Sequence, residues 1–137
     1  MDLQEILAEG EKRVWVWLTE KIAARHPVKV LKPPETSLVM MRARDSVEDS
    51  EFYLGEVLIT EAVVEINGVL GYGIALEDEP ERALCHAVIK AALAADLPER
   101  EEIQEVVDQQ RRQAESASDR KEGMVAGTRV RFAIMEG

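Results

Sequence analysis

The sequence predicts an α+β fold, in which a mainly antiparallel sheet of about four to five strands packs with N-terminal, central and C-terminal-half helices. Apolar and β-branched residues fill residues 52–66 and 69–76, and Asn67-Gly68 between them is the pair that a type I′ hairpin turn requires. Segments with apolar residues at helical spacing lie on both sides of this hairpin. The length of 137 residues and the hydrophobic fraction of 46% predict one domain, residues 1–137.

The first element expected is a helix over residues 2–26. Its apolar residues recur at helical spacing, and His26-Pro27 ends it, because the residue before a proline is pushed out of the helical region. Trp17 lies on the apolar stripe and is predicted to pack in the core. Trp15 lies beside the stripe, so core packing and contact with a partner are equal alternatives for it, since tryptophan is enriched at protein interfaces.

Two short strands are expected next, at residues 28–31 and 37–44. Pro33-Pro34 separates them, because proline cannot donate a hydrogen bond to a strand ladder. Residues 45–51 are polar and predict a loop. The sheet is therefore expected to begin with short strands and to continue with the long hairpin.

The hairpin carries two features beyond its turn. Residues 52–66 have apolar side chains on both faces, which predicts a central strand covered on both sides, or one bent near Gly55 or Thr60. In the return strand, Gly71 and a second glycine flank Tyr72. Because glycine weakens a strand, this pair indicates a bulge or another backbone that approaches closely.

A helix over residues 80–95 is expected after the hairpin, with proline in its first turn. Its apolar face includes Cys85, which is predicted to be buried, whereas His86 is predicted to be solvated beside Arg82 and Lys90. The three basic residues are spaced four apart and so line one face of the helix.

The last third of the chain predicts one more helix and one more strand. Asp96 and Glu99 resemble the N-cap and N3 residues of a capping box that opens a helix to about residue 116. Its thin apolar stripe predicts a helix half in solvent or docked on another chain. A polar linker over residues 116–127 then leads to a final strand over residues 128–135.

The composition limits the classes of partner and compartment. A formal net charge of −10 argues against nucleic acid as a direct partner, because binding to its backbone relies on clustered lysine and arginine. The acidic N-terminus lacks the pattern of a signal peptide, and no apolar run approaches the ~20 residues that span a bilayer. With a single cysteine, no intrachain disulfide can form. We expect a cytoplasmic protein with no membrane segment.

The chemically active residue types form no catalytic or metal-binding pattern. Cys85 and His86 are adjacent, and adjacent helical residues project about 100° apart, so they cannot face each other. Glu56 and Glu61 are an odd number of positions apart on a strand and point to opposite faces. No set of metal ligands and no phosphate-binding loop has a recognisable spacing. We therefore expect no catalytic residue and no metal site in this chain.

Four short segments nevertheless stand in a characteristic order along the chain: Leu54-Gly55-Glu56 with Thr60, Leu70-Gly71-Tyr72, Glu81-Arg82-Ala83, and residues 128–135. In this order and spacing, from about residue 35 to 135, the chain resembles the G subunit family, PhnG, of the bacterial carbon-phosphorus lyase system. It departs from many members by Glu61 after the strand threonine and by the acidic turn Glu77-Asp78-Glu79 before the helix. The resemblance therefore does not imply that the acidic turn of this chain binds an anion.

The resemblance implies a role in using phosphonates as a phosphorus source. The family's G subunit joins subunits H, I and J in a core complex, and it acts with H, I and L when a phosphonate displaces adenine from MgATP. That reaction gives alpha-D-ribose 1-methylphosphonate 5-triphosphate; its nucleosidase chemistry is attributed to subunit I and the later radical cleavage to subunit J. The chain is thus expected to be a non-catalytic accessory subunit without a cofactor of its own, while the assembled complex uses MgATP and phosphonate.

Several residues are candidates for contact with a partner or ligand: Gly55, Glu56, Thr60, Gly71, Tyr72, Trp15, Arg129 and Phe132. For each of these residues, a purely structural role in a turn or in the core of the sheet is at least an equal alternative. The thin stripe of the last helix also predicts self-association of the isolated chain.

Two other functions remain open from the sequence. A stand-alone enzyme acting on a small phosphorylated ligand would need a pocket that combines Arg42, Arg44, Arg129 and Arg131. A generic homo-oligomeric scaffold would need no pocket.

Overall fold

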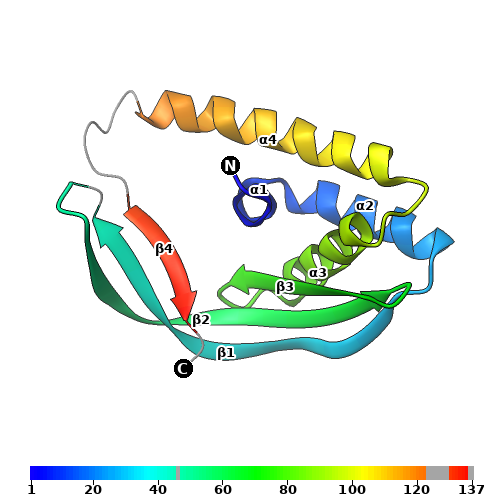
Figure 1. Ribbon diagram of the computed structural model, residues 1–137, viewed down its shortest axis with the longest axis horizontal. Helices are drawn as coiled ribbons and strands as arrows, with labels where there is room; N and C mark the ends of the chain where they lie inside the picture. The colour runs from blue at the N-terminus through cyan, green and yellow to red at the C-terminus, as the bar shows by residue number, and fades with distance from the viewer. Residues whose placement is uncertain (46, 123–129, 136–137) are drawn as a thin grey trace.

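The computed structural model describes residues 1–45, 47–122 and 130–135, and their side chains apart from those of Met41, Leu54 and residues 118–122 and 130–135. The elements are α1 (Leu3–Glu9), α2 (Lys12–Arg25), β1 (Lys29–Asp45), β2 (Ser50–Ile66), β3 (Val69–Leu76), α3 (Pro80–Ala94), α4 (Arg100–Glu122) and β4 (Val130–Met135). The strands form one antiparallel sheet in the order β3-β2-β1-β4. The helices lie on one side of it, with α3 next to the sheet and α4 farthest away (Figure 1). The predicted α+β class is confirmed.

The N-terminal segment forms two helices, so the prediction of a single helix over residues 2–26 is wrong. Gly10 ends α1 in an extended conformation, and its N–H bonds to the carbonyl of Ile6 at 2.8 Å. A Cβ at Gly10 would lie 2.3 Å from Cζ2 of Trp15. The chain therefore leaves the helix where the indole ring packs against bare backbone.

This break overturns the predicted core position of Trp17 and decides between the two alternatives left open for Trp15. Trp15 is 0% exposed and joins the main core, whereas Trp17 is 51% exposed. The break at Gly10 resets the helical phase, so the buried side of α2 runs through Trp15, Leu18 and Ile22 rather than through Trp17. The hypothesis that Trp15 offers an exposed anchor to a partner is wrong.

The strand before the hairpin is also continuous where two strands were predicted. Pro33-Pro34 falls within a register shift between Lys32 and Glu35 of β1. Within the described residues, β4 pairs with the far end of β1, Met40 to Asp45, and no strand pairs with the other side of β1 at the prolines. A proline there loses no ladder bond, and the strand passes through. β2 begins at Ser50, which shortens the predicted loop.

The β2–β3 hairpin has the predicted turn, with Asn67 at φ 51° and Gly68 at φ 79°. The close approach predicted at the glycines of β3 is confirmed, and the approaching backbone is that of α3. A Cβ at Gly71 would lie 2.0 Å from the carbonyl oxygen of Ala87, and one at Gly73 would lie 1.9 Å from that of Ala83. The two glycines therefore let α3 lie directly on the sheet.

The second half differs from the prediction in two details. Asp96 takes a φ of 54° and is not an N-cap, so the capping box is wrong. The carboxylate of Glu99 instead lies 2.8 Å from Nε2 of His26. Helix α4 continues to Glu122, and few of its side chains up to residue 117 are buried, among them Ile103 and Val107, as expected for a helix that is half in solvent or docked on another chain.

Candidate functional site

The candidate contact residues do not converge on one pocket. They are distributed over a polar network at the start of α3 (Thr60 and Trp15), the return strand β3 (Gly71 and Tyr72), the part of β2 opposite Met40 and Met41 (Gly55 and Glu56) and β4 (Phe132), and Arg129 lies outside the described residues. Contact of the other candidates, Trp15 excepted, with a partner or ligand stays a prediction.

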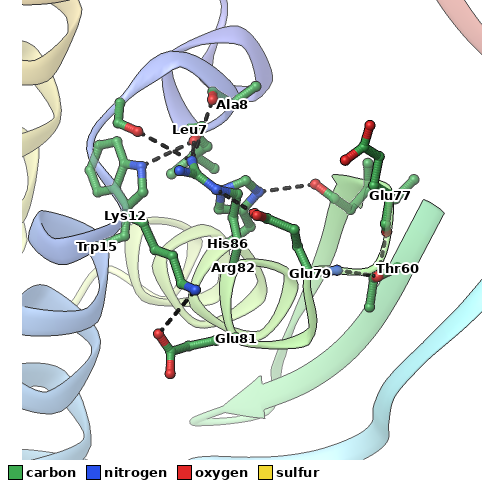
Figure 2. A network of polar contacts seen from close by, with 12 residues as sticks. Leu7, Ala8, Lys12, Trp15, Thr60, Glu77, Glu79, Glu81, Arg82 and His86 are labelled. Carbon is green, nitrogen blue, oxygen red and sulfur yellow. Dashed lines mark hydrogen bonds and ion pairs between the residues drawn. The ribbon is translucent and has the colours of Figure 1, made fainter. Parts of the chain in front are cut away.

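Arg82 is the centre of the network at the start of α3 (Figure 2). Its Nη1 donates to the carbonyls of Leu7, Ala8 and Gly10 at 2.9, 3.3 and 3.2 Å. The carbonyls of Leu7 and Ala8 belong to the last turn of α1, where they have no helical partner and where the helix dipole favours a cation, and Gly10 directly follows the helix. Nε of Arg82 donates to the Glu79 carboxylate at 2.9 Å, which balances the charge. Arg82 thus fixes α1 to α3.

Thr60 and Trp15 occupy opposite ends of this network. The Thr60 hydroxyl donates to the carbonyl of Glu77 at 2.7 Å and accepts from the N–H of Glu79 at 2.9 Å. It thereby holds the turn in which Glu77 takes a φ of 66° and from which Glu79 reaches Arg82. Nε1 of Trp15 donates to the carbonyl of Leu7 at 3.0 Å, the same carbonyl that Arg82 binds. Both candidate residues therefore position α1 against α3 in this chain.

His86 and Lys90 continue the same face of α3 one and two turns on. Nδ1 of His86 lies 3.0 Å from the carbonyl of Ile74, and because a carbonyl only accepts, Nδ1 carries the proton. Gln4 of α1 donates to this carbonyl at 3.2 Å, and Lys90 in turn donates to Gln4. His86 is 0% exposed, so its predicted solvation is wrong.

Burial makes His86 a neutral residue. Burial is the largest effect on the pKa of His86, which is lowered from 6.5 to about 4. The positive charges of Arg82 and Lys90 also lower this pKa, whereas the hydrogen bond to the carbonyl of Ile74 raises it. Burial also lowers the pKa of Lys90 and raises that of the Cys85 thiol. His86 and Cys85 face the interior and Lys90 is partly buried, so these side chains hold two helices and a strand together, and the imidazole and the thiol do not face solvent.

We expect the buried His86 to make folding sensitive to acid. Between pH 6.5 and about 4 the unfolded chain binds a proton that the folded chain does not, so stability falls as the pH is lowered through this window. The full difference corresponds to about 3 kcal/mol. In His86→Asn the side-chain amide can still donate to Ile74 but cannot titrate. Urea unfolding of both proteins from pH 7 to 4 should show a smaller acid loss in the variant; equal losses would contradict a neutral buried His86.

A second cluster lies on the sheet face opposite the helices. Nζ of Lys32 donates to Glu61 at 2.9 Å, and Glu61 is only 6% exposed. Hydrogen bonds from Lys32 and then Tyr72 lower the pKa of the Glu61 carboxyl against the opposing effect of burial. The carboxylate is therefore ionised and paired at neutral pH, which suits a fixed contact across strands rather than proton transfer.

Of the four arginines that the alternative enzyme hypothesis needs, Arg42 and Arg44 have described side chains, and both lie beside carboxylates. Nη1 of Arg42 lies 3.4 Å from Oε2 of Glu51, and Nη2 of Arg42 donates to the Tyr53 hydroxyl at 2.8 Å. Nη2 of Arg44 lies 2.7 Å from Oδ1 of Asp49. In the described part of the chain no three His, Cys, Asp or Glu side chains gather as a metal site, and no helix is long and apolar enough to cross a membrane.

The sequence signalled this network only in part. The basic residues at positions 82, 86 and 90 share a face because of their spacing, but nothing local identified α1 as what that face contacts. The bond from Arg82 to Leu7 joins residues 75 positions apart, which no local pattern encodes.

Comparisons with known proteins relate the whole chain to one family. The family model of the phosphonate metabolism protein PhnG matches residues 2–137. A protein of Rhizobium meliloti (strain 1021), alpha-D-ribose 1-methylphosphonate 5-triphosphate synthase subunit PhnG, is 30% identical over 109 residues, which cover 79% of this chain and 69% of the relative.

Proposed function

The chain belongs to the PhnG family of phosphonate metabolism proteins, and from this we propose that it is a non-catalytic accessory subunit of a ribose 1-methylphosphonate 5-triphosphate synthase. The assembled enzyme would transfer the ribose 5-triphosphate moiety of ATP to a phosphonate, displacing adenine. The observation that carries the proposal is the family match over residues 2–137. The name of the relative, a synthase subunit, supports work within an assembly rather than alone.

The described side chains are consistent with a supporting role. His86 and Cys85 are buried, and the buried Glu61 is paired with Lys32. In this proposal the partners are subunits H, I and J, with L in the reaction, MgATP and phosphonate are bound by the assembly, and the complex works in the cytoplasm.

The purified chain alone is expected to release no adenine from MgATP and methylphosphonate, because among the described side chains His86 is buried and Glu61 is paired with Lys32, so neither is free to act as a base. Subunits H, I and L should release adenine only when the chain is added. Adenine should be followed by chromatography, with the three subunits alone as the control.

Turnover by the chain alone, abolished by Glu61→Gln in the same preparation, would contradict the accessory role. Unchanged turnover by subunits H, I and L with and without the chain would contradict its membership of the working assembly.

A further inference from the structure

Strand β3 forms one edge of the sheet. The order β3-β2-β1-β4 gives it β2 as its only strand neighbour in the described chain. The helices cover one face of the sheet, and the opposite face of β3 carries no helix (Figure 1). A sheet edge presents backbone donors and acceptors that can template another strand.

The other free edge of the sheet is protected against such pairing. The stretch of β1 that β4 does not reach contains Lys29, Lys32, Pro33 and Pro34, and two register shifts interrupt its ladder. Lysines, prolines and bulges are the usual means by which proteins prevent edge-to-edge pairing. This fold therefore protects one of its edges.

Strand β3 has none of these protections. Its sequence, VLGYGIAL, contains no charged residue and no proline, and its register with β2 runs without a shift from Val69 to Leu76. Among the described contacts, the side chains of Gln4 and His86 bind the outer side of this edge at one point, where both donate to the carbonyl of Ile74. The segment before that point, from residue 69 to 73, is a regular uncharged edge.

The two-residue turn fixes which backbone groups point outward. Ile66 and Val69 close the hairpin and exchange ladder bonds, so Val69 and Gly71 direct their backbone groups to β2 while Leu70 directs its own to the edge. The carbonyl of Ile74, four positions on in the same phase, does point away from β2, since Gln4 and His86 reach it. Leu70 is thus an outward position of the edge before Ile74.

The side chains of β3 suit a partner strand. Leu70 and Leu76 are 61% and 54% exposed and belong to the same alternating set, on the sheet face without helices. An added strand hydrogen-bonds through its backbone and packs alternate side chains beside such a row.

We propose that an extended, uncharged strand of another subunit of the synthase assembly adds to β3 along residues 69–73, pairing with the backbone of Leu70. The inference rests on the proposed function for the identity of the partner as a subunit. A second copy of this chain is the less favoured occupant, because each copy carries a formal charge of −10 and two copies repel.

Amide hydrogen exchange of the wild-type chain, alone and in the purified assembly with subunits H, I and J, tests the pairing directly. The Leu70 amide should exchange at least about tenfold more slowly in the assembly, the factor that corresponds to one net hydrogen bond. The amides of Lys29 and Val30, on the protected edge, should not change. Leu70→Pro removes the outward N–H without touching the β2 ladder, and Leu70→Thr keeps it. The proline variant should bind the other subunits about tenfold more weakly than the threonine variant.

The outcomes separate the two proposals. Assembly of the wild-type chain with unchanged exchange at Leu70 would overturn strand addition and leave the proposed function intact. Equal weakening by both variants would overturn it too, because the side chain and not the backbone would then bind. Slowing in the isolated chain together with a dimer mass would show a second copy and overturn the partner named here. A wild-type chain that joins none of the subunits would overturn the proposed function and this inference with it.

Discussion

Gly71→Val is expected to lower the free energy of unfolding by about 3 kcal/mol or to prevent folding. A Cβ at this position would lie 2.0 Å from the carbonyl oxygen of Ala87 and 2.7 Å from the backbone nitrogen of Ala91. Both atoms belong to the backbone of α3, so no flexible side chain can move aside. Helix α3 would have to withdraw from the sheet, which also opens space in the core between them. Thermal unfolding followed by circular dichroism measures the loss.

The neighbouring substitution Leu70→Val is the matched control, because it places the same side chain on the same strand at a position that is 61% exposed. Its stability should stay within about 0.5 kcal/mol of the wild type. The cause at Gly71 is close packing, since its φ is not among the positive values that Gly55 and Gly68 adopt. A wild-type melting temperature for Gly71→Val would show that α3 does not lie on β3 as described.

The features that the sequence predicted well are those set by neighbouring residues. Asn67-Gly68 fixes the hairpin turn by its own backbone preferences, and the glycine pair in β3 signals a close backbone approach whatever the approaching element is. The start of α3 at Pro80 follows from the conformation of proline alone. Each of these signals is local, so a single sequence contains it.

The features that the sequence did not predict depend on contacts between distant residues. Glu99 stands where a capping box needs it, but its carboxylate binds His26, which is 73 positions away. Burial of His86 depends on α1 and β3 closing around it, as its bond to Ile74 and the path from Lys90 to Gln4 show. The candidate site followed the same division: the residues were named from local segments, but the network that joins Thr60 to Trp15 runs through tertiary contacts of Arg82.

Trp15→Ala is expected to cost about 3 to 5 kcal/mol of folding stability, the range for truncating a buried tryptophan. The indole is 0% exposed, packs against Gly10, and donates to the Leu7 carbonyl at 3.0 Å. Its removal leaves a large cavity between α1 and α2. It also takes one of the two donors from a carbonyl that Arg82 still binds at 2.9 Å.

Trp17→Ala is the control, because it removes the same side chain two positions along the same helix, where it is 51% exposed. It loses the contact with Lys21, whose Nζ lies 5.3 Å from the ring centroid, a cation–π contact worth about 0.5 to 1 kcal/mol at an exposed site. Urea unfolding followed by circular dichroism should therefore place Trp15→Ala well below Trp17→Ala in midpoint. Near-equal midpoints, or the reverse order, would mean that α1 and α2 form the single continuous helix that the apolar spacing alone predicts, with Trp17 in the core.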